Sequence, residues 1–138
     1  MIPLRDDNPS SSRPVVTWLL ILVNVLVSAY MFTLSSESAI ERFISAFAAV
    51  PAEVTGRGGG MPIGEYPTLI TSMFLHGGLL HLIGNMLYLW IFGDNVEDLM
   101  GHGGFLIFYL LSGLAAVWTH ILLYPTSTVP LVGASGAI

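Results

Sequence analysis

Residues 69–93, with the sequence LITSMFLHGGLLHLIGNMLYLWIFG, decide the fold. This stretch is apolar over most of its length and carries no Asp, Glu, Lys or Arg, yet it contains His76, His81 and Asn85. The adjacent glycines at 77 and 78 would be a weak point in a helix. We therefore predict a membrane-spanning helix over residues 78–99, with residues 69–75 leading into it along the membrane interface.

Two further stretches are long enough to cross a bilayer. Residues 15–34 are free of charge, and a 20-residue helix covers about 30 Å, the thickness of a hydrocarbon core. A signal peptide would have a shorter apolar region, so we predict a retained span here. Residues 104–124 form the next predicted span, and a fourth starts near residue 133. The sequence thus predicts an all-α, polytopic transmembrane helical bundle with about three complete spans.

Composition supports a membrane protein and excludes several other classes. The 138 residues are 54% hydrophobic and 9% charged, with a mean hydropathy of +0.76, whereas soluble domains carry about 25% charged residues. A net charge of −5 argues against nucleic-acid binding, which needs a basic patch. The absence of cysteine excludes disulfides and thiolate-bound metal. We expect the lipid bilayer as a partner, and neither a cofactor nor a metal.

The loop between the first two spans, residues 35–77, contains a helical pattern of its own. Ser38 followed by Glu41 is typical of a capping box, and Pro51 would close the helix. Apolar residues then recur on one helix face: Ile40, Phe43, Ile44, Phe47 and Val50. We predict a helix over residues 39–50. It suits the membrane interface and packing against the spans equally well.

The distribution of arginines bears on orientation. The tail before the first span and the loop after it each carry two arginines, and the loop after the second span carries none. The positive-inside rule therefore gives a tie. Arg13 lies directly beside the first span, which favours a cytoplasmic N-terminus.

Spacing brings polar residues of separate spans to one depth. His81 and Asn85 are four residues apart and share a helix face. The third span returns the chain to the side where the second began, so Ser135 at the start of the fourth lies at the same shallow level. A serine at a helix N-terminus has free N–H groups beside it, and Gly133 and Gly136 permit close approach of a substrate. His81 and Asn85 could donate hydrogen bonds to an oxyanion, where one donor is worth ~10²–10³ in rate.

Two other interpretations of these residues remain open. The segment 133–137, GASGA, is also a small-xxx-small pattern typical of helix contacts, although its register with His81 and Asn85 favours a nucleophile. Alternatively, His81 and His120 could ligate haem in a membrane subunit, since both lie near the same membrane surface. That alternative leaves Asn85 and the serine turn unexplained.

The sequence resembles the rhomboid intramembrane serine proteases. The resemblance is carried by HGGLLHLIGNMLYLWIFGDNVEDLMG at residues 76–101, GASGAI at the end and MIPLRDDNP at the start. It implies a serine endopeptidase of the cell (inner) membrane that cleaves transmembrane protein substrates near the membrane boundary. By the same resemblance Ser135 is the nucleophile, and His81, Asn85 and the backbone N–H of Ser135 form the oxyanion hole. His76 matches the preceding histidine of the family and Glu97 its acidic motif, but Leu99 stands where a basic residue is common.

The resemblance also sets expectations about what lies beyond residue 138. Rhomboids have a core of six spans with the general-base histidine on the sixth, and none of His76, His81, His102 and His120 matches that position. We expect the 138-residue chain to be a truncated or incomplete part of a longer protein that is inactive alone. If Ile138 is the natural C-terminus, the leading alternative is a non-catalytic rhomboid-like subunit packed with other subunits of a membrane complex.

Overall fold

A computed structural model describes residues 12–57 and 66–138, and its regular elements in these ranges are helices, with one isolated bridge between Ala49 and Leu131. The N-terminal residues 1–9, which contribute to the resemblance, lie outside the described residues. The elements are α1 Val15–Thr33, α2 Glu37–Phe47, α3 Pro51–Val54, α4 Thr68–Thr71, η2 Ser72–Phe74, α5 Leu79–Leu123 and η3 Ala134–Gly136. Among the described residues, α1 and α5 are long and apolar enough to cross a membrane. The number of spans stays a prediction.

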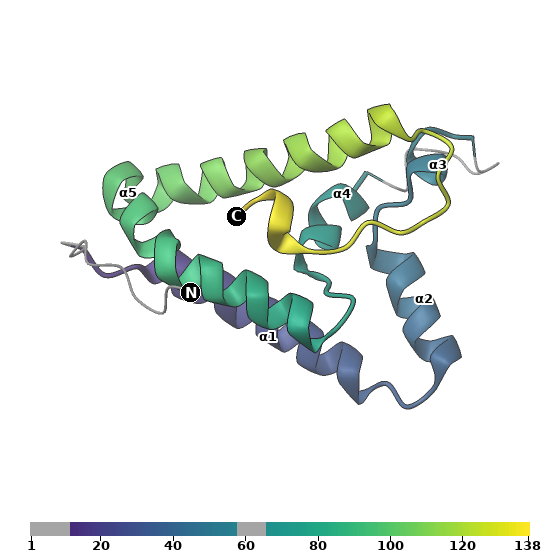
Figure 1. Cartoon of the computed structure of the whole chain (residues 1–138), viewed down its shortest axis with the longest axis horizontal. Helices are drawn as coiled ribbons and strands as arrows, with labels where there is room; N and C mark the ends of the chain where they lie inside the picture. The colour runs from purple at the N-terminus through teal and green to yellow at the C-terminus, as the bar shows by residue number, and fades with distance from the viewer. Residues whose placement is uncertain (1–11, 58–65) are drawn as a thin grey trace.

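Helix α5 is bent into two arms at Gly101. This glycine has φ 71° and ψ 161°, which interrupts the helical backbone between residues 79–100 and residues 102–123. A positive φ of this kind is open to glycine and costly for other residues. Figure 1 shows the first arm running beside α1 and the second arm turning back over the molecule, with the C-terminal segment entering between them.

The first arm of α5 lies in close contact with α1. A Cβ at Gly93 would stand only 2.9 Å from Cγ2 of Thr17, so the two backbones approach at a point where a larger residue does not fit. Glycine at a helix crossing allows this close approach and the dispersion contacts that come with it. The pairing of the predicted first and second spans therefore depends on a small residue in each helix.

Glu97 ties the N-terminus of α1 to the end of the first arm. Its buried carboxylate accepts hydrogen bonds from the backbone N–H groups of Val16 and Thr17, both at 2.8 Å, and from the Thr17 hydroxyl at 2.7 Å. These N–H groups have no partner within their own helix, and a helix N-terminus favours negative charge. His102 donates a further hydrogen bond at 2.5 Å, while Leu99 is exposed. The carboxylate thus has a histidine partner five residues further along the chain and none at Leu99.

The loop helix differs in its ends from the sequence prediction. Helix α2 begins after Ser36, whose Oγ accepts a hydrogen bond from the N–H of Ala39 at 3.2 Å, so the cap is Ser36 and not Ser38. It ends at Phe47, three residues before the predicted end, and Pro51 opens α3 at its first position instead of closing α2. The Phe43 ring lies 5.4 Å from that of Tyr30, so α2 packs on the end of α1.

Hydrogen bonds strap the chain after α5 onto the first loop. The N–H of Leu131 donates to the carbonyl of Ala49 at 2.8 Å, and the N–H of Gly133 donates to the carbonyl of Ser72 at 3.0 Å. Buried side chains of α1, η2, α5 and the C-terminal segment form one core cluster: Leu20, Met73, Leu89, Phe105, Tyr109, Ala134 and Ala137. The two hydrogen bonds and this cluster together fix the position of η3.

Candidate active site around Ser135

Ser135 sits in the middle of the short helix η3. Ala134 before it is completely buried, whereas Ser135 itself is exposed. The carbonyl of Ala134 accepts hydrogen bonds from the N–H groups of Ala137 and Ile138, at 2.8 and 3.2 Å. Within residues 12–57 and 66–138 the Ser135 hydroxyl has no hydrogen-bond partner. The backbone turn is therefore anchored by its neighbours while the hydroxyl is left accessible.

The two glycines that flank this turn are required for different reasons. Gly133 has φ 121°, and a Cβ there would stand 2.6 Å from Cε1 and 2.8 Å from Nε2 of His81. Gly136 packs against α5, because a Cβ there would stand 2.5 Å from Cβ of Ala116. The segment thus makes both the helix contact and the serine turn that the sequence left as alternatives.

The structure brings the predicted polar cluster to this turn. Besides its contact with His81, the Cβ position of Gly133 lies 3.8 Å from Nδ2 of Asn85. His81 and Asn85 come from the first arm of α5, one helical turn apart, and Gly133 lies two residues before Ser135. Donor groups therefore stand beside the backbone of the serine turn, while their part in catalysis stays a prediction.

His76 is buried behind the cluster. Its Nε2 lies 3.0 Å from Nδ2 of Asn85, its Nδ1 lies 3.3 Å from the hydroxyl of Ser28, and its ring centroid is 5.2 Å from that of His81. Burial and the neighbouring His81 lower the pKa of His76 to about 4. His76 is therefore neutral at pH 7, so that one ring nitrogen is left as an acceptor.

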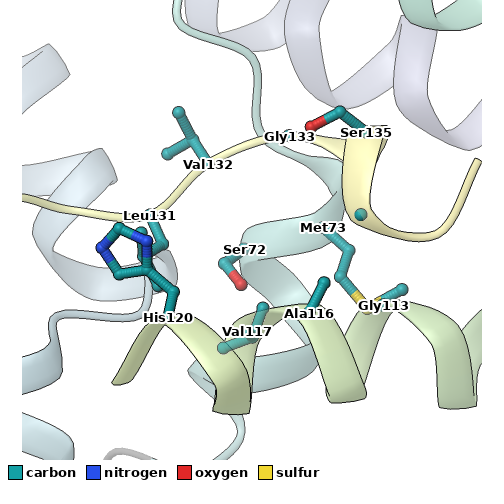
Figure 2. A pocket seen from close by; sticks show the side chains of 11 residues that line it. Ser72, Met73, Gly113, Ala116, Val117, His120, Leu131, Val132, Gly133 and Ser135 are labelled. Carbon is teal, nitrogen blue, oxygen red and sulfur yellow. The ribbon is translucent and has the colours of Figure 1, made fainter. Parts of the chain in front are cut away.

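A cleft of about 160 Å³ opens beside Ser135. Its walls come from the second arm of α5, from η2 and from the C-terminal segment: Ser72, Met73, Gly113, Ala116, Val117, His120, Leu131, Val132, Gly133, Ser135 and Gly136. In Figure 2 His120 and Ser135 stand on opposite sides of the view, with Ser72 and Ala116 between them. The nucleophile candidate thus borders a partly polar cleft.

The two histidines of the haem interpretation have different neighbours. His81 contacts Gly133 and faces His76, whereas His120 lines the cleft and its ring lies 5.0 Å from that of Tyr124. None of these contacts joins His81 to His120.

Three residues of the site were not singled out from the sequence for the parts they play here. Ser28 contacts His76, the Ser72 carbonyl holds Gly133, and Ala116 receives Gly136. The available signal for Ser28 is that it is a polar residue within an apolar run, which is equally typical of a helix–helix contact. No local pattern marks Ser72 or Ala116.

Comparison with known proteins identifies the family. The sequence profile of the Rhomboid domain matches residues 63–138, more than half of the chain. The chain belongs to the rhomboid family. It is 32% identical over 128 residues to rhomboid protease GluP of Bacillus subtilis (strain 168), covering 93% of this chain and 23% of the relative. It is 35% identical over 130 residues to the putative rhomboid protease YdcA of the same organism, covering 91% of this chain and 57% of the relative.

Shorter matches include rhomboid-like protein 11, chloroplastic, of Arabidopsis thaliana, which is 39% identical over 69 residues, covering 50% of this chain and 24% of the relative. No solved structure matches the chain at comparable significance. The chain spans about a quarter of GluP and somewhat over half of YdcA. The rhomboid family is membrane-embedded, which agrees with the two long apolar helices.

Proposed function

We propose that this rhomboid protein is an intramembrane serine endopeptidase that cleaves transmembrane protein substrates near the membrane boundary. Ser135 is the nucleophile, and His81, Asn85 and the backbone N–H of Ser135 form the oxyanion hole. One observation carries the proposal: the His81 ring and the Asn85 amide both lie beside Gly133. This glycine has φ 121° and directly precedes η3, the short helix that contains Ser135. Gly133 and Gly136 shape the turn, and His76 supports Asn85.

The residues support acyl transfer in the following way. The Ser135 Oγ attacks the scissile carbonyl carbon, and a base takes the hydroxyl proton, since a serine is a weak nucleophile without one. Negative charge then develops on the carbonyl oxygen, where His81 and Asn85 donate hydrogen bonds. Collapse releases the amine with the base's proton and leaves an acyl ester, which water hydrolyses. By the family resemblance the base is a histidine on a later span, beyond residue 138.

The proposed setting is the cell (inner) membrane with the N-terminus in the cytoplasm. Arg13 precedes α1 directly, which favours that orientation. The site then lies at a shallow depth on the opposite side of the bilayer, where the exposed end of a substrate helix can reach Ser135.

Cleavage by the protein with all its spans tests the proposal. In proteoliposomes containing a single-span substrate, we expect wild-type protein to cleave and Ser135→Ala to be inactive. Asn85→Ala and His81→Ala should each lower kcat by ~10–10³ while the protein stays folded, because each removes one oxyanion donor. Circular dichroism and thermal unfolding provide the folding control.

Two results would contradict the proposal. Cleavage by Ser135→Ala at the wild-type rate would remove the nucleophile. A well-folded wild type that cleaves no single-span substrate and reacts with no serine-directed probe would favour the non-catalytic subunit instead.

A further inference from the structure

A buried polar network joins α1 to the candidate oxyanion donor. His76 and Ser28 are each 1% exposed, although they come from different elements and lie 48 residues apart. The Ser28 hydroxyl lies 3.3 Å from Nδ1 of His76, and Nε2 of the same ring lies 3.0 Å from Nδ2 of Asn85. The three side chains therefore form one continuous row from α1 to the first arm of α5.

The chemistry of an amide nitrogen sets the direction of these hydrogen bonds. Nδ2 of Asn85 carries two N–H donors and cannot accept, so Nε2 of His76 must be the acceptor. A neutral imidazole then carries its proton on Nδ1, and the ring N–H has two acceptors, the Ser28 hydroxyl oxygen and the backbone carbonyl of Phe74. In the other tautomer, Nε2–H would face an amide N–H and the bond to Asn85 would be lost, while the Ser28 hydroxyl would donate to Nδ1 instead.

The Ser28 hydroxyl is directed outward from its own helix. Serine and threonine hydroxyls within helices commonly bond to the carbonyl one turn earlier. Asn24, one turn away on α1, bonds in that way to the carbonyl of Leu20 at 2.8 Å. Ser28 instead reaches His76 on the loop that precedes α5. A hydroxyl buried in an apolar helix and bonded across to another element is expected to fix that element's geometry.

We propose that Ser28 is a positioning residue for the reaction: its hydroxyl holds the His76 ring in the orientation that directs Nε2 at Asn85, and thereby keeps the second N–H of Asn85 free for the oxyanion. This inference rests on the proposed function. It makes α1 part of the catalytic geometry, because a hydroxyl of α1 holds the ring that contacts the Asn85 amide beside Gly133.

Matched substitutions at Ser28 separate the hydroxyl from side-chain packing. Ser28→Thr and Ser28→Val add nearly the same shape, and the first keeps the hydroxyl. In the protein with all its spans, we expect Ser28→Val to lower kcat about tenfold with KM unchanged, less than the ~10²–10³ of losing a donor outright. Ser28→Thr should stay near the wild-type rate. If neither larger side chain folds, Ser28→Ala removes the hydroxyl without adding atoms.

A double-mutant cycle supplies the readout that a merely structural role would not move. In an Asn85→Ala background, Ser28→Val should lower kcat no further, because the group it positions is already gone. Additive losses would overturn the inference. Nitrogen-15 NMR of His76 in lipid nanodiscs should show the proton on Nδ1 in the wild type and a weakened hydrogen bond from Asn85 to Nε2 in Ser28→Val.

The outcomes distinguish this inference from the proposed function. If the wild type cleaves but Ser28→Val and Ser28→Ala match its kcat, or if His76 carries its proton on Nε2, the positioning role fails and the protease stands. If the wild type is no more active than Ser135→Ala, the proposed function fails, and the catalytic role of Ser28 fails with it.

Discussion

At the scale of single residues, the serine turn shows how one short segment meets two demands. Gly133 is needed for its positive φ and for the space taken by the His81 ring, while Gly136 is needed for contact with Ala116. Within the four residues 133–136, one glycine therefore makes room for a candidate oxyanion donor and the other makes the contact with α5. Substitutions at the two glycines should have separable consequences.

We predict that Gly136→Ala destabilises the protein and that Ala116→Gly partly restores it. The added Cβ would stand 2.5 Å from Cβ of Ala116, and overpacking of this kind costs about 1–3 kcal/mol. Ala116→Gly removes the opposing methyl group and so relieves the clash. It restores the free energy of unfolding only in part, because glycine within a helix itself costs about 1 kcal/mol. Thermal unfolding of the two single variants and the double variant in detergent measures this. Additive losses would refute the contact.

At the scale of elements, the ends of α1 and the first arm of α5 are coupled through Glu97. The carboxylate satisfies two N–H groups and one hydroxyl of α1, and it does so while completely buried. Its fourth partner, His102, has a side chain that is 54% exposed. The groups of α1 should therefore contribute more to the free energy of unfolding than His102 does.

We predict that Glu97→Gln lowers the free energy of unfolding by about 2–4 kcal/mol, since hydrogen bonds to a charged group contribute about 1.5–3 kcal/mol each and the amide keeps only one acceptor oxygen. His102→Ala should cost less than about 1 kcal/mol, because the His102 side chain is 54% exposed and solvent screens its side of the contact. Unfolding in mixed micelles measures both. Equal losses would mean that the histidine, and not the cap on α1, holds the two helices.

The sequence predicts elements better than it predicts their contacts. Long uncharged runs specify where helices form, and the four-residue spacing of His81 and Asn85 specifies that they share a face. The spacing of Ser38 and Glu41 predicts the wrong cap for α2, because Ser36 also lies beside an acidic residue, Glu37, and backbone geometry decides between the two serines. The pairing of Ser28 with His76 spans 48 residues, so no local period can encode it.

At the scale of the whole molecule, the two arms of α5 and α1 surround a C-terminal segment that the first loop straps in place (Figure 1). The first loop therefore carries part of the site: it holds Gly133 through Ser72 and supplies His76. The membrane arrangement that follows from the proposed function puts this loop and Ser135 on the side opposite the N-terminus.

Cysteine labelling tests that arrangement. With impermeant maleimide on sealed vesicles, single cysteines introduced at Ser35 and Ser127 should label from one side, and one at Ser10 from the other. The chain crosses once between residues 10 and 35 and twice between residues 35 and 127 in the predicted topology. Labelling of all three positions from the same side would contradict it. Permeabilised vesicles, in which every position should label, provide the control.

The central claim is that Ser135 is a nucleophile whose base lies on a later span. A fluorophosphonate forms a covalent bond with a serine only when a neighbouring base activates the hydroxyl. In serine proteases that have lost a member of the catalytic triad, the remaining rate enhancement over water is only ~10³–10⁴. Mass spectrometry should find the adduct on Ser135 in the protein with all its spans. It should find none in residues 1–138 alone or in Ser135→Ala. Robust labelling of Ser135 in the 138-residue chain would contradict a base beyond residue 138, and no adduct in the longer protein would contradict the nucleophile itself.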